Sequence, residues 1–268
     1  MKFTHITEAF CITRYMNERD MNEWLKWHID ICHFDHIHIF DNDSNFDLKS
    51  VCDQYHNKVS YEAIHGYPRQ YAIYDDYVNN KSTADWVMPI DDDEYLELSN
   101  DFSSVADAIS YYKGQMPDME MLAVRWKHLF PVKFKTERTG NVLDYCTREH
   151  LTLASSFHNM GDRAVKTIVH RSGKVHYQER CEIINRGHIP LHEKADFAYG
   201  FDGTKLVKNS FDQIPQNTEN EKIRLIHCRY KGYSDYLNKY ILNEGITISD
   251  EEPHKKQFMF NYILPTLD

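Results

Sequence analysis

The chain has 268 residues, and its 31 lysines and arginines are outnumbered by 41 aspartates and glutamates, which gives a formal net charge of −10. An acidic chain without a basic block is a poor match for nucleic-acid binding, which depends on neutralising phosphates with lysine and arginine. The length suits one large α/β domain, and an aromatic content of 13% argues against disorder.

Strands and helices are predicted to alternate along the first part of the chain, and a capping box of Asp20 and Glu23 is expected to begin the first helix. Strands are predicted at 8–13, 36–40, 59–63 and 86–90, with helices at 20–33, 48–55 and 70–80. This alternation predicts a mostly parallel sheet, whose ligands bind beyond the carboxyl ends of its strands.

The second part of the chain gives fewer signals, and no linker forces a domain boundary within it. A helix is predicted at 103–112, strands at 121–126 and 164–170, and a further helix at 235–243.

The six cysteines form no CxxC pair, which predicts reduced, mostly buried thiols in a cytoplasmic protein. The first residues lack the apolar stretch of a signal peptide. The sequence also contains no run of about 18 apolar residues, so no transmembrane helix is expected. We therefore expect a cytoplasmic location, with any membrane contact being peripheral.

Polar clusters follow three of the predicted strands, and the most acidic is Asp91-Asp92-Asp93-Glu94. If residues 90–93 stay extended, Asp91 and Asp93 project to one side and Asp92 to the other. The pair can then hold Mg²⁺ or Mn²⁺, which bridges to a diphosphate. The alternative is an acidic turn that begins a helix, where carboxylates favour the positive end of the dipole. The apolar strand before the cluster favours the metal site.

Three motifs stand out in the first part of the chain: the N-E…E-W…H segment at 17–28, HIFDNDS at 38–44 and WVMPIDDDEY at 86–95. Together they resemble the family 2-like and family 92-like glycosyltransferases, with weaker similarity at 161–169, 188–192 and 226–239. The resemblance implies one GT-A domain over residues 1–268. Residues 1–100 would bind the nucleotide sugar and residues 101–268 the acceptor.

The resemblance also implies site residues. Asp91 and Asp93 would bind the metal, and His227 would complete its shell, although a histidine at a strand end can equally bond to the backbone. Lys166, a lysine among apolar residues, either extends to solvent or reaches an anion. The candidates for donor binding are Thr13, Arg14, Asn17, Glu18, Asp41, Asn42, Arg69, Gln70, Asp92, Lys166 and Lys231.

Inverting transfer needs a base that deprotonates the acceptor hydroxyl. Asp162 and Glu193 are the two catalytic candidates, and Asp144 and Glu149 are further acids nearby in the sequence. The residues after Trp126 depart from the small-residue pattern of the family, so the acceptor stays undefined.

These features predict a metal-dependent, inverting glycosyltransferase of polysaccharide biosynthesis. It would move a hexose from a UDP-sugar to a glycan, glycolipid or glycoprotein acceptor. Two alternatives stay open: a sugar-nucleotide nucleotidyltransferase, and a non-catalytic module that binds nucleotide sugars. The loop after the first strand, ITRYMNERD, contains no glycine, which argues against the phosphate loop of a nucleotidyltransferase.

Overall fold

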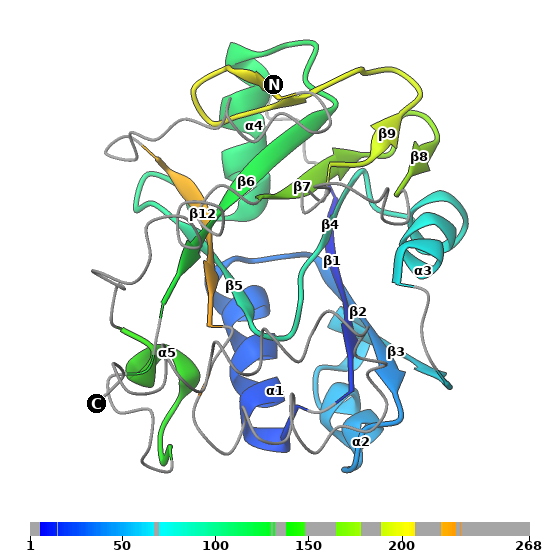
Figure 1. Ribbon diagram of the computed structural model, residues 1–268, viewed down its shortest axis with the longest axis vertical. Coiled ribbons are helices and arrows are strands. Elements are labelled where there is room, and N and C mark those ends of the chain that lie inside the picture. Colours follow the sequence, from blue (N-terminus) through cyan, green and yellow to red (C-terminus); the bar gives the residue numbers. More distant parts are fainter. Residues whose placement is uncertain are drawn as a thin grey trace, which may run out of the picture.

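The computed structural model has an α/β fold in which helices flank a central sheet (Figure 1). It describes residues 6–14, 16–66, 70–129, 131, 138–147, 165–177, 189–206, 221–228 and 231. Within these ranges no helix combines the length and the hydropathy needed to cross a bilayer.

The first part of the chain alternates between strands and helices as the sequence predicts. Its elements are β1 (Thr7–Thr13), α1 (Glu18–Lys26), η1 (Trp27–Ile31), β2 (His36–Asn42), α2 (Leu48–Asp53), η2 (His56–Lys58), β3 (Val59–Ile64), α3 (Gln70–Asp76), η3 (Tyr77–Lys81) and β4 (Trp86–Pro89). Here η1 and η3 are π-helical continuations of α1 and α3, and η2 is a 3₁₀ turn.

The second part adds further strands and two more described helices. They are β5 (Glu94–Leu98), α4 (Val105–Gln115), β6 (Met121–His128), α5 (Val142–Tyr145), β7 (Val165–His170), β8 (Val175–His176), β9 (Leu191–His192), β10 (Ala198–Tyr199), β11 (Lys205–Leu206) and β12 (Ile223–His227). The predicted helix at 235–243 lies outside the described residues.

The central sheet is mostly parallel, which confirms the predicted α/β class. Its order is β11-β10-β6-β7-β4-β1-β2-β3, and β3, β2, β1 and β4 all run in the same direction. β7 lies between β4 and β6 and is antiparallel to both. Because of this reversal, the first residues of β7 lie at the same edge of the sheet as the carboxyl end of β4.

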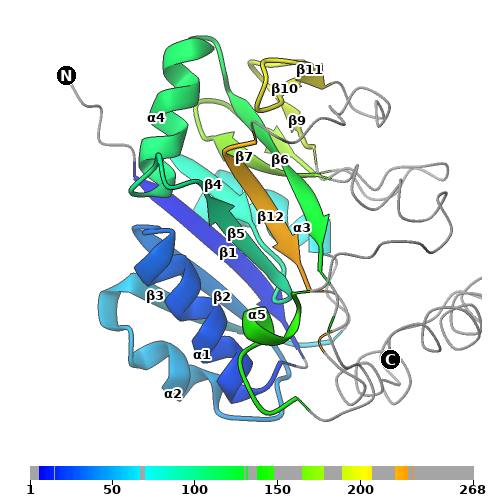
Figure 2. The ribbon, with the colours of Figure 1, turned by 90° about the vertical axis from the view of Figure 1, so that its left-hand side faces the viewer.

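Alternate residues of β1 pack into two separate cores, because successive side chains of a strand point to opposite faces. Ala9 and Cys11 belong to the core that includes residues of α1, α2 and α4, whereas Phe10 packs with Tyr74 and Tyr77 of α3 and η3. Figure 2 shows α1 and α2 on one face of the sheet and α3 on the other. The helices therefore cover both faces and leave ligand access at the strand ends.

The start of α1 differs from the predicted capping box. Asn17 is the N-cap, and its side chain accepts a hydrogen bond from the backbone N–H of Asp20. Asp20 is instead buried against Arg138, and Glu23 accepts the backbone N–H groups of Val142 and Leu143 at the start of α5. Both acids serve tertiary contacts, which local spacing cannot reveal.

The acidic cluster is a tight turn, so the expectation of an extended segment at 90–93 is wrong. The backbone N–H of Glu94 donates to Asp91 O at 3.0 Å, which closes the turn between β4 and β5. The alternative of an acidic helix start is also wrong, because Glu94 begins a strand that pairs antiparallel with β12. This pairing brings His227 opposite Glu94.

Five of the six cysteines lie in the described residues, and all five are buried free thiols, as predicted: Cys11, Cys32, Cys52, Cys146 and Cys228.

Candidate functional site

Side chains from five strands, or from the turns that follow them, meet at the carboxyl edge of the sheet. Thr13 ends β1 and lies in register with Asp41 of β2. The acidic turn follows β4, and His227 ends β12. Lys166 joins them from the second position of β7, because that strand runs in the opposite direction.

The indole of Trp24 in α1 hydrogen-bonds to the backbone of the acidic turn. Its indole Nε1–H is shared between two carbonyl oxygens, Glu94 O at 2.9 Å and Asp91 O at 3.1 Å. The Glu94 carboxylate in turn accepts the backbone N–H of Asp91 at 2.8 Å. These contacts fix the turn backbone, so the three aspartate side chains leave it in defined and different directions.

Asp93 is directed at His227. Asp93 Oδ1 lies 3.3 Å from His227 Nε2, and the two side chains are only 4% and 7% exposed. The backbone N–H of Cys228 also donates to Asp93 O at 2.8 Å. The site thus contains a buried carboxylate oxygen beside an imidazole nitrogen, which are both donor types for Mn²⁺.

Asp92 points to the opposite side of the turn. Its Oδ2 accepts the hydroxyl of Thr13 at 2.8 Å. Lys231 donates to the carbonyl oxygen of Asp92 at 3.1 Å, and its ammonium lies 3.9 Å from Asp20. A positive charge is therefore held beside the carboxylates.

Asp91 is directed at Lys166, and Oδ1 is the atom that makes the contact. Lys166 Nζ lies 2.8 Å from Asp91 Oδ1 and 3.6 Å from Glu94 Oε2. Burial opposes the charge on Lys166, but the two carboxylates keep its pKa well above the ordinary value. Burial, and then the charge of Asp91, raises the pKa of Glu94 well above its ordinary value.

Gln70, at the start of α3, lies at the same carboxylate. Its amide donates to Tyr74 Oη at 2.6 Å and lies 3.4 Å from Asp91 Oδ1. The Tyr74 hydroxyl is 3.3 Å from the same oxygen. Gln70 was expected to touch the donor; the structure places it against Asp91.

The end of β2 offers a second polar group of side chains. Asp41 accepts the hydroxyl of Tyr61 at 2.8 Å and the backbone N–H of Ser44 at 2.9 Å, and it is 8% exposed. Asn42 is 2% exposed, and its Oδ1 has no hydrogen-bond partner among the described residues. A buried amide oxygen of this kind normally has a partner, so a bound ligand is a natural donor to it.

The remaining candidates for donor binding divide into three groups. Arg14 is half-buried directly after β1, at the edge where the site lies. Asn17 and Glu18 are exposed at the start of α1, where the side chain of Asn17 is used as the helix cap. Arg69 and the catalytic candidate Asp162 lie outside the described residues.

Glu193 is not brought to the site. It is exposed, and its carboxylate accepts the backbone N–H of Lys174 at 2.9 Å. Because β7 is antiparallel to β4, the chain beyond His170 lies at the level of Trp86, the first residue of β4. Glu193 therefore lies at the edge of the sheet opposite to the carboxylates, and the expectation that it serves as the base is not supported.

In the described ranges, no three His, Cys, Asp or Glu side chains gather in a cluster that could hold a metal by themselves. The Asp93–His227 pair would supply two ligands to a bound ion, and Mg²⁺ commonly takes only one or two carboxylates and completes its shell with water and substrate phosphates. The residues present therefore fit a cation that is shared with a bound diphosphate.

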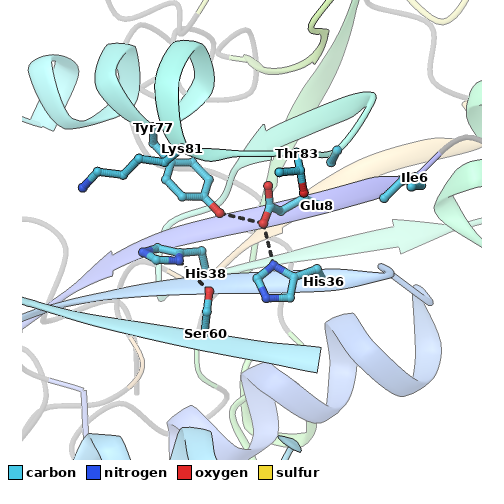
Figure 3. Close-up of a pocket in the computed structure, with 9 residues that line it drawn as sticks. Ile6, Glu8, His36, His38, Ser60, Tyr77, Lys81 and Thr83 are labelled. Atoms are coloured by element: carbon cyan, nitrogen blue, oxygen red, sulfur yellow. Dashed lines mark hydrogen bonds and ion pairs between the residues drawn. The ribbon is translucent and has the colours of Figure 1, made fainter. Parts of the chain in front are cut away.

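A separate cavity of about 220 Å³ lies at the amino ends of β1 and β2, at the edge of the sheet opposite to the acidic turn. Figure 3 shows Tyr77 and His36 pointing at Glu8 within it. These groups and the hydroxyl of Ser82 hold the pKa of Glu8 below its ordinary value, although burial opposes them. Glu8 thereby links β1 to β2 and to both ends of η3, which is a structural role.

Trp24, Tyr61 and Tyr74 were not among the residues expected at the site. The hydroxyl or indole of each fixes a carboxylate or the turn itself. Tyr74 lies four residues after Gln70, on the same face of the helix, and this spacing is the one signal that could have pointed to it.

No family model matches the sequence, and no curated protein matches it. Solved structures that are similar include 4-diphosphocytidyl-2C-methyl-D-erythritol synthase from Anaerococcus prevotii, with 9% identity and a TM-score of 0.35 over 63% of this chain and 71% of that chain. A mannosyltransferase from Pyrobaculum calidifontis, solved with GDP-Man and Mn²⁺, has 14% identity and a TM-score of 0.35 over 46% of this chain and 36% of that chain.

TarS from S. aureus, in complex with UDP-GlcNAc, has 12% identity and a TM-score of 0.38 over 62% of this chain and 45% of that chain. This chain thus spans less than half the length of the mannosyltransferase and TarS chains. At these identities and TM-scores, none of the three identifies the function of this chain, which has to be argued from its own residues.

Proposed function

We propose that this chain is a metal-dependent, inverting glycosyltransferase of the GT-A type. It would bind a UDP-hexose at the carboxyl edge of the sheet and transfer the hexose to a hydroxyl group of a glycan or glycoconjugate. The observation that carries the proposal is the buried pair of Asp93 and His227, 3.3 Å apart at the edge where parallel sheets bind ligands.

The end of β2 suits the nucleoside. Asn42 Oδ1, buried without a partner among the described residues, can accept a hydrogen bond from a ribose hydroxyl or a base N–H. Asp41 is oriented for the same purpose, since Tyr61 and the backbone of Ser44 fix its carboxylate. Thr13 lies in register with Asp41, which supports a nucleoside position between the ends of β1 and β2.

The acidic turn suits the diphosphate only if a cation accompanies it, because an anionic ligand is otherwise repelled. Asp93 and His227 would hold Mn²⁺ or Mg²⁺, and the bound ion would neutralise the charge of the departing diphosphate. Lys231, which donates to the Asp92 carbonyl, adds a positive charge at the same place.

We place the base that deprotonates the acceptor hydroxyl in the second half of the chain. Asp162 remains our candidate, since Glu193 lies at the opposite edge. Residues 101–268 would then form the acceptor half, and residues 1–100 the nucleotide half.

A donor panel tests the proposal. UDP-glucose, UDP-galactose and UDP-N-acetylglucosamine are incubated with the protein and Mn²⁺, with and without EDTA, and the nucleotide products are separated by chromatography. We expect UDP release from at least one donor, which EDTA and Asp93→Asn abolish and the surface variant Asp53→Asn leaves unchanged. Pyrophosphate-dependent formation of UTP would instead indicate a nucleotidyltransferase. Binding of UDP without turnover of any donor would indicate a non-catalytic module.

A further inference from the structure

Lys166 is a fully buried lysine in the middle of a candidate active site. Its side chain is 0% exposed, and in β7 it lies opposite Val124 of β6. An ammonium group in such a place has to be compensated by nearby anions, because removing its charge from water is costly.

The groups that compensate the charge of Lys166 lie on one side of the acidic turn. Asp91 Oδ1 receives Lys166 at 2.8 Å, and the hydroxyl of Tyr74 and the amide of Gln70 lie 3.3 and 3.4 Å from the same atom. Glu94 Oε2 lies 3.6 Å from Lys166. These protein donors compete with a metal ion for that oxygen of Asp91.

The other side of the turn has a different environment. Asp93 faces His227 of β12, and no contact between Lys166 and Asp93 is found in the described residues. The turn therefore separates two kinds of carboxylate. Asp91 and Glu94 lie beside the ammonium of Lys166, whereas Asp93 faces the imidazole of His227.

We propose that Lys166 is a positioning residue, a permanent internal cation for Asp91 and Glu94 that leaves Asp93 and His227 as the protein ligands of the metal. This inference rests on the proposed function and refines its site, because the sequence favours Asp91 and Asp93 as a metal pair. It also gives Lys166 a role other than contact with the diphosphate, since its ammonium lies 2.8 Å from Asp91 Oδ1.

The first test compares three variants in one assay. Mn²⁺ binding in the presence of UDP is followed by the loss of the electron paramagnetic resonance signal of free Mn²⁺. We expect Asp93→Asn and His227→Ala to weaken binding by more than about 100-fold, and Asp91→Asn by no more than the roughly 10- to 100-fold of a group outside the metal shell. Equal losses for Asp91→Asn and Asp93→Asn would overturn the proposal.

The second test removes the internal cation. Lys166→Met leaves the Asp91 carboxylate without its internal cation, and a divalent ion should replace the ammonium, because affinity rises with the ligand charge of a site. We expect Mn²⁺ binding without UDP to tighten by at least about 10-fold, and Lys166→Arg to bind as the unaltered protein does. A lysine with a packing role alone would produce no such gain.

Two controls keep the outcomes separate. Lys58→Met removes an exposed positive charge and should leave Mn²⁺ binding unchanged. If Lys166→Met does not fold, the comparison of Asp91→Asn with Asp93→Asn decides the matter. If the unaltered protein binds no Mn²⁺ with UDP, the proposed function fails. The inference about Lys166 fails instead if binding is normal but Lys166→Met gains no UDP-independent site.

Discussion

Replacing Arg138 with methionine should destabilise the fold strongly, because it leaves a buried carboxylate without its main partner. The guanidinium and Asp20 are 2% and 1% exposed, and Arg138 Nη2 lies 2.6 and 2.5 Å from the two oxygens of Asp20. Burial opposes the ionisation of Asp20, but the charge of Lys231 and the hydrogen bond and charge of Arg138 together keep the pKa of Asp20 below its ordinary value.

The expected loss is about 3 kcal/mol in the free energy of unfolding, the lower end of the usual 3–5 kcal/mol for a buried pair that loses one partner. The lower end applies because Lys231 remains 3.9 Å from Asp20 and still offers a positive charge. The carboxylate contribution is present above the unfolded pKa of Asp20, near 3.8, and is lost as the pH falls below it, so the effect should be measured at pH 7.

Urea unfolding, followed by tryptophan fluorescence, gives the measurement. Lys49→Met, which breaks the exposed pair with Asp53, is the matched control and should leave the free energy of unfolding close to that of the unaltered protein. The double variant Asp20→Asn with Arg138→Met should cost clearly less than the sum of the two single variants. A loss below about 1 kcal/mol for Arg138→Met, or full additivity, would refute the reasoning.

Three further predictions concern the site and its support. Trp24→Phe removes the indole donor to the acidic turn, and it should lower the free energy of unfolding in urea by about 1–3 kcal/mol. It should also raise the KM for the donor sugar more than it lowers kcat. An unchanged KM would contradict the role of Trp24. Tyr61→Phe removes the hydroxyl that orients Asp41, and calorimetry should show UDP binding weakened by about 5- to 10-fold, whereas unchanged affinity would separate Asp41 from the nucleoside. Burial lowers the pKa of His38 to about 4. The buried neutral form therefore contributes its full stability above the unfolded pKa of 6.5, and this contribution is lost as the pH falls from 6.5 toward 4. Between these pH values, the Tm of His38→Gln should fall less steeply with pH than the Tm of the unaltered protein. An identical slope of Tm against pH would contradict this assignment.

The α/β class and the elements of the first part of the chain could be predicted from sequence because they depend on local patterns. Apolar runs and helical spacing placed β1, β2, β3 and β4 within a few residues of their observed bounds. The position of the acidic cluster after β4 followed from the same pattern, since carboxyl ends of parallel strands share one edge.

The directions of the three aspartates could not be predicted, because they depend on contacts between distant segments. Trp24 fixes the turn from α1, and His227 arrives through the pairing of β12 with β5. Lys166 reaches Asp91 because β7 is reversed in the sheet, and no local signal in its sequence distinguishes that direction. The same reversal carries Glu193 to the opposite edge.

Calorimetric titration of UDP into the unaltered protein and into Asp93→Asn, each with Mn²⁺ and with EDTA, tests the central claim most directly. We predict that Mn²⁺ tightens UDP binding to the unaltered protein by at least about 30-fold and has no comparable effect on Asp93→Asn, because the carboxylate shares the cation with the diphosphate. Equal UDP affinity with Mn²⁺ and with EDTA, or an undiminished effect of Mn²⁺ on Asp93→Asn, would contradict the assignment of this edge as a metal–diphosphate site.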